Sequence, residues 1–553
     1  MIDCERNCIM EKKVTIRKPV FITMAAIYIF VIVLGLVSPE KFANAEAAIV
    51  DFACINFAWM YQILTVCLIG FCFWVMFNKK VGDIKLGGKN AKPFMSKWAW
   101  FVITLCGGIA TGIVFWGIAE PLTHFFDGIP LFPGIEPGSP EAAKLALSTT
   151  YLHWGLGEYA YYAVPGIVIG FAVYNMKLPY RISSCLYPLF GKAVMGKIGT
   201  FIDILCVFGI AGGVSASLCE GALQIGAGLG IITKVTPGHF IWLVILTTVV
   251  ITFILSSYTG INRGVRFFSD ANAKIYLALL AFVLFFGPSM YILNLATEAM
   301  GWHVSHFFEQ VLYTGSWNVI EGEPDMWPTW WTVNYWSWMI AYAPLMGIFL
   351  AKVARGRTLR EFTIYNFILP GLFDCIWFGI FGAAAIKFDQ DTGSKIWNLM
   401  GESGTEAAVF GFFENLPATK ILQVIFIFTV FISIVTLADS MTTTISSLSI
   451  NAKNAATVEP PAKIKIFWGI CLSLVAFVNL ATASTVGKVS GIDATKSLAI
   501  SVAFPLTFVM ILILVAGVKM LANADDYNVV DNPDGHKVDP DLILDFDIDE
   551  VVD

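Results

Sequence analysis

Trp338, Tyr342 and Met346 are spaced by four residues, so they lie on one face of a helix. Aromatic rings attract a cation that has no N–H donor, such as a trimethylammonium group, by up to about 2 kcal/mol for each well-placed ring. Pro344 and Gly347 lie in the same apolar run and predict a break in that helix. A break at mid-depth in a membrane span is tolerated where the freed backbone groups line a cavity. The pattern therefore predicts a cavity with aromatic walls.

A second aromatic cluster lies in the apolar run 149–174. Trp154 and Glu158 share one helix face, and Tyr159 and Tyr162 share another. A carboxylate inside an apolar run is costly and is a functional candidate by default. Beside aromatic rings, Glu158 favours a net cation and repels the carboxylate of a zwitterion. We therefore expect a positively charged ligand, with simple zwitterions less favoured.

The composition places these clusters in a membrane. The chain has 553 residues, of which 57% are hydrophobic and 14% charged, whereas a soluble protein has about 25% charged residues. Runs of about 20 apolar residues predict membrane helices. We expect an all-α polytopic protein with twelve spans, near residues 19–37, 55–77, 98–118, 149–174, 201–230, 238–257, 269–293, 331–352, 364–387, 421–448, 465–483 and 497–520.

Lysine and arginine residues occupy every second predicted loop, as between Lys79 and Lys97 and between Lys352 and Arg360. Basic loops stay in the cytoplasm, so both termini are expected there and the membrane is expected to be the plasma membrane. The first span follows cations that end at Lys18 and has no small-residue cleavage site, so it is interpreted as a retained helix.

The predicted spans 3–7 and 8–12 form two halves of five. The first span of each half is interrupted, by Gly108 and Gly112 in one half and by Pro344 and Gly347 in the other. Such paired interruptions indicate an inverted repeat with a binding site at mid-membrane. The expected parts are a cytoplasmic N-terminus (1–18), accessory helices (19–77), a first repeat (98–293), an amphipathic surface helix (303–317), a second repeat (331–520) and an acidic, disordered cytoplasmic tail (521–553).

Four stretches of the chain resemble the betaine/carnitine/choline transporter family. They are residues 108–121 (GIATGIVFWGIAEP), 153–162 (HWGLGEYAYY), 221–229 (GALQIGAGL) and 335–361, which ends in RGRTLRE. The resemblance implies a LeuT-like fold of five plus five inverted helices. It also implies secondary transport of a quaternary ammonium compound, such as betaine, carnitine, γ-butyrobetaine or choline, by a homotrimer.

The resemblance also implies roles for individual residues. Trp154, Trp338 and Tyr342 fall at the positions of the family's aromatic cage, with Tyr159 where many members have tryptophan. Met339 falls where many members have a second tryptophan, so the substrate is expected to differ. The remaining positions that match are Tyr162 in the cage, Phe115 and Trp116 as further walls, and Gly108, Ala110 and Gly112 as the flexible strip of span 3.

The coupling ion is expected to differ from that of the sodium-driven members. Thr436 and Leu437 stand where those members have two hydroxyl residues, so one sodium ligand is missing. Met346 and Lys274 resemble the methionine and the fixed cation of the sodium-independent carnitine/γ-butyrobetaine exchangers. Sodium-independent exchange is therefore expected, and the alternative is sodium- or proton-coupled symport. The other interpretation of Lys274 is a side chain that extends to the membrane surface.

The role of Glu220 is open, whereas three other polar residues have a single interpretation. Glu220 pairs with Lys274, carries a proton, or faces a vestibule as a helix-end residue. Glu120, His124 and His153 are interpreted as local hydrogen-bonding residues.

Other classes of protein have little support in the sequence. The chain has no G-x-S-x-G, H-E-x-x-H or Walker motif and no cysteine cluster with metal-ligand spacing. We therefore expect no enzyme, cofactor, metal or nucleic-acid partner. A channel would need a repeated selectivity filter, and an osmosensor without flux remains the third alternative.

Overall fold

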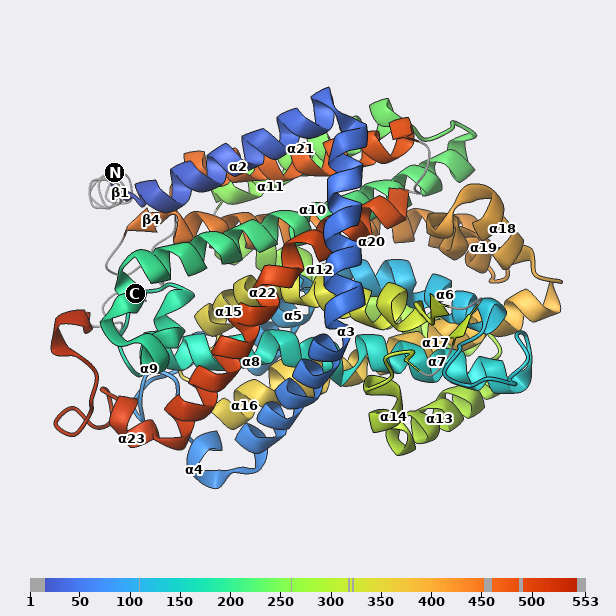
Figure 1. Ribbon diagram of the computed structural model, residues 1–553. Helices are drawn as coiled ribbons and strands as arrows, with labels where there is room; N and C mark the ends of the chain where they lie inside the picture. Colours follow the sequence, from blue (N-terminus) through green and yellow to red (C-terminus); the bar gives the residue numbers. More distant parts are fainter. Residues whose placement is uncertain are drawn as a thin grey trace.

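The computed structural model describes residues 15–108, 110–259, 261–316, 319–320, 323–451, 460–486 and 491–544. The protein is built almost entirely of helices (Figure 1). The long helices are α2 (Lys18–Val37), α3 (Pro39–Phe77), α5 (Lys97–Gly108), α6 (Ala110–Asp127), α7 (Pro140–Trp154), α8 (Leu156–Tyr174), α10 (Lys197–Thr233), α11 (His239–Thr259), α12 (Ile261–Phe286), α13 (Ser289–Ser305), α15 (Asn334–Val353), α17 (Leu369–Asp391), α20 (Thr419–Leu448), α21 (Ala462–Val486) and α22 (Gly491–Ala522).

Short elements join the long helices. Two antiparallel strand pairs connect Thr15–Ile16 (β1) with Ile450–Asn451 (β4) and Val319–Ile320 (β2) with Glu323–Pro324 (β3). The short helices are α4 (Lys79–Gly82), α9 (Tyr187–Phe190), α14 (Phe307–Val311), α16 (Leu359–Thr363), α18 (Lys395–Ser403), α19 (Ala408–Phe413) and α23 (Ala524–Tyr527). In Figure 1, β1, α4, α9 and α23 lie at one end of the molecule, and α13, α14 and α18 lie at the other.

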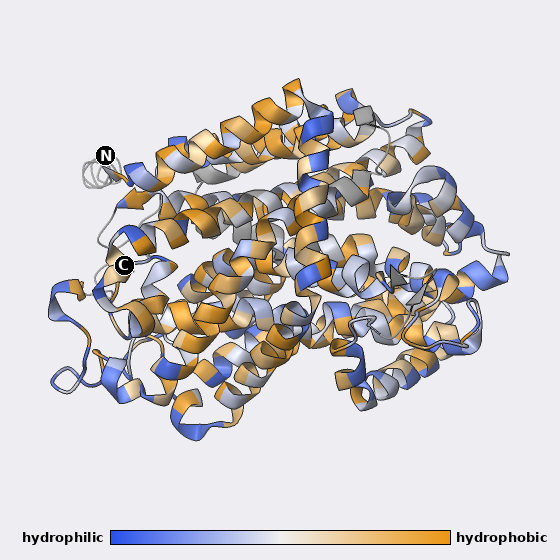
Figure 2. Cartoon of the chain, in the orientation of Figure 1, coloured by the Kyte–Doolittle hydropathy of each residue, from blue (hydrophilic) through white to orange (hydrophobic). Residues whose placement is uncertain are grey.

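Ten of the described helices are long and apolar enough to cross a membrane. Figure 2 shows hydrophobic residues along the length of the helices and hydrophilic residues gathered at their ends. Large apolar side chains such as Phe30, Phe240 and Phe285 are exposed on the outer helices, as expected for surfaces that contact lipid. The predicted spans 98–118 and 238–257 correspond to α5–α6 and α11, so the count of twelve stays a prediction.

The predicted span 331–352 does not contain the predicted break. Helix α15 runs without interruption from Asn334 to Val353, through Pro344 and Gly347. Gly347 has another use: a Cβ at this position would lie 2.6 Å from Cβ of Pro165. Glycine here lets α15 approach α8 closely, and a proline within a membrane helix is tolerated when neighbouring groups satisfy the backbone. The prediction of a break in this helix is therefore wrong.

An interruption does occur in the predicted span 149–174. Helix α7 ends at Trp154 and α8 begins at Leu156, with Gly155 between them at ψ −133°, far from helical geometry. A Cβ on Gly155 would lie 2.4 Å from the carbonyl oxygen of Tyr151. A residue without a side chain is therefore needed at this junction.

The predicted surface-helix segment 303–317 does not form a single helix. Helix α12 ends at Phe286, and Pro288 precedes α13, which runs from Ser289 to Ser305 and is followed by α14. The predicted segment 303–317 contains only the end of α13 and all of α14. Proline cannot supply the N–H that would continue α12, so the chain turns at this point.

The acidic tail is ordered over much of its length, in contrast to the prediction. Nζ of Lys192 lies 2.6 Å from Oδ2 of Asp539, and the backbone N–H of Leu544 donates to the carbonyl of Lys177 at 2.9 Å. Val538 is buried. Composition alone suggested disorder, but basic loops at the same end of the molecule pair with the carboxylates. The last residues, 545–553, lie outside the described part of the chain.

The basic loop after α15 joins two parts of the chain. Arg357 donates to the carbonyl of Met95 at 2.6 Å and stacks over Trp100, with 5.0 Å from the guanidinium carbon to the ring centroid. Lys97 pairs with Glu361 at 2.8 Å. The RGRTLRE segment therefore holds the start of α5 against the end of α15.

Replacing Gly356 in this loop by alanine should destabilise the protein. Gly356 has φ +79°, and a Cβ there would lie 2.4 Å from backbone atoms of Lys92 and Pro93. Gly393 has φ +70° with nothing within 4 Å, so Gly393→Ala should cost only about 1–2 kcal/mol for the left-handed backbone. Thermal unfolding in detergent should show a clearly larger fall in Tm for Gly356→Ala. Equal falls for the two variants would contradict the predicted backbone clash.

Candidate functional site

A cavity between α6, α7, α8, α10 and α15 is lined by four of the predicted ligand-binding residues. Four of its rings, Trp154, Tyr162, Trp338 and Tyr342, are called the aromatic box below. They come from α7, α8 and α15. The cavity is lined by Gly112, Trp154, Glu158, Tyr162, Ser217, Trp338, Met339 and Tyr342. The structure therefore brings together residues that are far apart in the sequence, and Met339 lies among them.

Hydrogen bonds hold two rings of the box in place. The hydroxyl of Tyr342 donates to the carbonyl of Gly213 at 2.6 Å and lies 2.6 Å from Oγ of Ser217. Nε1 of Trp154 donates to Oε2 of Glu120 at 2.5 Å, and the Trp154 ring stacks on Phe378 at 5.3 Å between centroids. Fixed rings lose little freedom when a ligand binds.

Glu120 joins three side chains behind the box. Its Oε1 lies 2.6 Å from Nδ1 of His153 and 3.3 Å from Nε2 of His124, and its other oxygen accepts from Trp154. His153 also contacts Thr332 at 3.0 Å. The ligand atoms of Glu120 and the two histidines lie within 4.8 Å of one another, as in a metal site. Hydrogen bonding among them accounts for the arrangement, as the sequence predicted, and it orients Trp154.

Two carboxylates are buried beside the box. Glu158 lines the cavity, and Asp374, on α17, lies behind it. The hydroxyl of Tyr159 donates to Oδ2 of Asp374 at 2.9 Å, and the hydroxyl of Tyr162 donates to Oε1 of Glu158 at 3.5 Å. Tyr159 therefore contacts Asp374 instead of lining the cavity. Sequence reasoning missed Asp374, although a carboxylate within the apolar run 364–387 was a sufficient signal.

Phe115, Trp116 and Glu220 form a separate group. Nε1 of Trp116 donates to Oε1 of Glu220 at 2.9 Å, and Phe115 lies 5.0 Å from Trp116 between ring centroids. Trp116 also packs edge-to-face on Tyr335 at 5.7 Å. None of the three is among the described residues that line the cavity, so the predicted role of Phe115 and Trp116 as cavity walls does not match the structure.

Lys274 does not lie where the predicted cation substitute should be. Its side chain is 68% exposed, and its Nζ pairs with Asp270 at 2.5 Å, one helical turn earlier. Glu220, which is fully buried, contacts Trp116 instead of Lys274. A long lysine side chain reaches the surface more cheaply than it can be desolvated. The alternative interpretation of Lys274 therefore fits the structure, and the predicted role in an ion site does not.

The other residues of the predicted ion site are buried. Met346, Thr436 and Leu437 are each at most 3% exposed. The hydroxyl of Thr436 has no hydrogen-bond partner among the described residues. Leucine at position 437 has no side-chain oxygen that could act as a ligand.

Gly112 is the part of the glycine strip that contacts the box. A Cβ at Gly112 would lie 2.8 Å from two ring atoms of Trp154. Gly108 ends α5 and Ala110 begins α6. The side-chain surroundings of these two residues lie outside what the structure describes.

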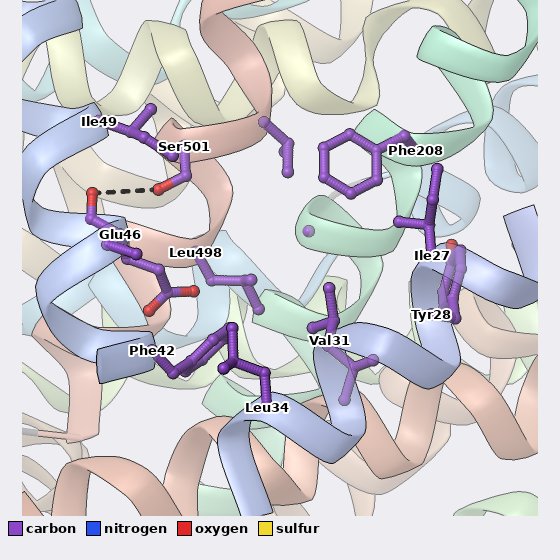
Figure 3. Close-up of a pocket in the computed structure, with 14 residues that line it drawn as sticks. Ile27, Tyr28, Val31, Leu34, Phe42, Glu46, Ile49, Phe208, Leu498 and Ser501 are labelled. Carbon is purple, nitrogen blue, oxygen red and sulfur yellow. Dashed lines mark hydrogen bonds between the residues drawn. The ribbon is translucent and has the colours of Figure 1, made fainter. Parts of the chain in front are cut away.

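A second cavity lies between α2, α3, α10 and α22, away from the box (Figure 3). Its lining is apolar apart from a few groups, among them Glu46 and Ser501. Figure 3 shows the carboxylate of Glu46 near Phe42 and Leu498, while the backbone carbonyl of Glu46 accepts from Ser501 at 3.3 Å. Glu46 is thus a buried carboxylate on α3 that has no part in the box.

Comparison with known proteins identifies the family. The model of the "BCCT, betaine/carnitine/choline family transporter" matches residues 19–526. The chain belongs to the betaine/carnitine/choline transporter family. It is therefore a multi-pass membrane transporter and not an enzyme.

Similar proteins in this family come from several bacteria. A probable glycine betaine transporter of Desulfitobacterium hafniense is 32% identical over 90% of this chain and 96% of its own length. An ectoine/hydroxyectoine transporter of Virgibacillus pantothenticus is 30% identical over 93% of this chain and 98% of its own length. An osmo-dependent choline transporter of Acinetobacter baylyi is 29% identical over 91% of this chain and 71% of its own length.

Proposed function

We propose that this transporter carries quaternary ammonium compounds across the plasma membrane by alternating access, with a preference for net cations such as choline. The observation that carries this proposal is the aromatic box with Glu158 in its wall. Aromatic faces hold a cation without N–H donors, and a carboxylate beside them adds attraction for net positive charge. Relatives named as betaine and choline transporters support the substrate class.

The coupling is proposed to be independent of sodium. Leu437 in place of a hydroxyl residue and the buried Met346 support this, whereas the exposed Lys274 does not. The proposed mode is the exchange of one quaternary ammonium compound for another across the membrane. Sodium- or proton-coupled symport is the alternative. Counterflow in proteoliposomes with carnitine, γ-butyrobetaine, glycine betaine and choline, with and without sodium, separates them, and uptake that stops without sodium would contradict the proposal.

Replacing Glu158 by glutamine should weaken transport of choline about tenfold, or about 1.4 kcal/mol, and that of glycine betaine by less than about threefold. The carboxylate attracts the net cation, but its charge is opposed by the carboxylate of the zwitterion. Counterflow with both substrates measures this difference. Glu46→Gln, which removes a buried carboxylate outside the box, should change neither choline transport nor glycine betaine transport. Equal losses for the two substrates would contradict a role of Glu158 in charge selection.

The remaining features of the assembly are also proposals. We infer a five-plus-five inverted repeat, a homotrimer and cytoplasmic termini. The positions of β1, α4, α9 and α23 at one end of the molecule are compatible with cytoplasmic termini (Figure 1). Cross-linking in membranes tests the trimer, and cysteine labelling from either side of the membrane tests the orientation.

A further inference from the structure

Glu158 and Asp374 form a pair of carboxylates that is completely enclosed. Both residues are 0% exposed. Their tyrosine partners, Tyr159 and Tyr162, pack edge-to-face with 6.3 Å between the ring centroids, so the two carboxylates lie on either side of one tyrosine pair. Each accepts one hydrogen bond from a tyrosine, and Oε2 of Glu158 and Oδ1 of Asp374 have no hydrogen-bond partner among the described residues.

The described surroundings supply no positive charge to this pair. The titratable groups that act on the two carboxylates or on their tyrosine partners are Glu120, Tyr159, Tyr162, Tyr342 and Cys375. No lysine, arginine or histidine of the described residues makes an ion pair with Glu158 or Asp374. The surrounding helices therefore offer hydroxyls, rings and the carboxylate of Glu120, which is itself paired with His153 and His124.

Two adjacent carboxylates cannot both remain charged in such surroundings. A buried unpaired charge is strongly unfavourable, and a second like charge nearby makes it more so. When the box is empty, the pair must therefore bind a proton. A cation in the box removes this need, because Glu158 faces the cavity and its charge is then paired.

We propose that the Glu158–Asp374 pair binds a proton in the empty box and releases it when a net cation binds. This inference rests on the proposed function. One positive charge enters as one leaves, so the charge enclosed by the site does not change. Glu158 contacts the cation, whereas Asp374 acts through Glu158 as a positioning residue. A zwitterion brings its own carboxylate and therefore displaces no proton.

The test is proton release by the purified full-length protein in weakly buffered detergent solution with a pH indicator. Choline should release close to one proton for each molecule bound near neutral pH, and glycine betaine close to none. By linkage, choline affinity should rise up to about tenfold for each unit of pH increase while glycine betaine affinity changes little. Tryptophan fluorescence measures binding of both ligands in parallel.

Variants separate the pair from other carboxylates. Glu158→Gln should abolish proton release and flatten the pH dependence of choline affinity. Asp374→Asn, which leaves the cavity lining unchanged, should still bind choline but release less than half a proton. Glu46→Gln should behave like the natural protein. If a variant does not give a monodisperse protein, the pH dependence of choline affinity in the natural protein tests the proposal instead.

The outcomes distinguish the two proposals. Choline binding without proton release, or release that survives in both Glu158→Gln and Asp374→Asn, overturns the proton inference and leaves the proposed function standing. Absence of binding by choline and by glycine betaine, measured in the natural protein, overturns the proposed function itself.

Discussion

Replacing Gly112 by leucine should abolish transport, with a loss of at least about 100-fold. Even a Cβ at this position would lie 2.8 Å from the indole of Trp154. Trp154 cannot move away easily, because it donates to Glu120 and stacks on Phe378. The leucine side chain therefore fills the space that the ligand needs, since extra atoms in a packed site force costly rearrangement. Counterflow of choline and of glycine betaine measures the loss, and Gly112→Ala should give a smaller one.

The matched control for this prediction is Gly70 on α3. A Cβ on Gly70 has nothing within 4 Å, so Gly70→Leu adds the same volume to a membrane helix without touching the box. It should leave counterflow near the natural level. If Gly112→Leu transports normally while remaining folded, the cavity described here is not the path of the substrate.

Removing the ring of Trp338 should weaken choline binding about 30-fold. A good cation–π contact contributes up to about 2 kcal/mol when it is desolvated, and this energy corresponds to about a 30-fold change in Kd. Trp338→Phe should lose much less, because the ring face remains. The indole N–H of Trp338 has no hydrogen-bond partner among the described residues, so phenylalanine breaks no such bond. Titration of tryptophan fluorescence with choline gives both values of Kd.

Trp98 provides the control for loss of a tryptophan. It lies at the start of α5, is 49% exposed and is outside the box. Trp98→Ala should keep the choline Kd within about twofold. Similar Kd values for Trp338→Ala, Trp338→Phe and the natural protein would show that this ring does not contact the cation.

The aromatic box could be predicted because it depends on helix periodicity. Spacings of three and four residues place rings on common helix faces, and the resemblance indicated that the two helix faces meet. The structure does bring Trp154, Tyr162, Trp338 and Tyr342 around one cavity. The position of Tyr159 was harder to predict, because its hydrogen-bond partner Asp374 is more than two hundred residues away in the chain. No local pattern contains such a contact.

Other features depended on tertiary contacts that the sequence does not display. Pro344 suggested a break, but α15 is continuous through it, and the neighbouring Gly347 packs closely on Pro165 of α8. The sequence around Lys274 could not distinguish a buried ion substitute from an exposed partner of Asp270. The acidic tail is ordered by contacts with basic residues such as Lys192, which composition does not reveal. In each case the deciding contact is one that only the folded chain creates.

The junction at Gly155 has a consequence for how the substrate is recognised. Trp154 belongs to α7 and Glu158 to α8, and the non-helical backbone at Gly155 separates these two helices. A ligand can contact both residues only when the angle between α7 and α8 brings them to the correct separation. It binds tightly only to conformers with the correct angle and so shifts the population toward them. The bound substrate then fixes the angle between α7 and α8. A cation too small to reach both residues would bind without selecting a conformer.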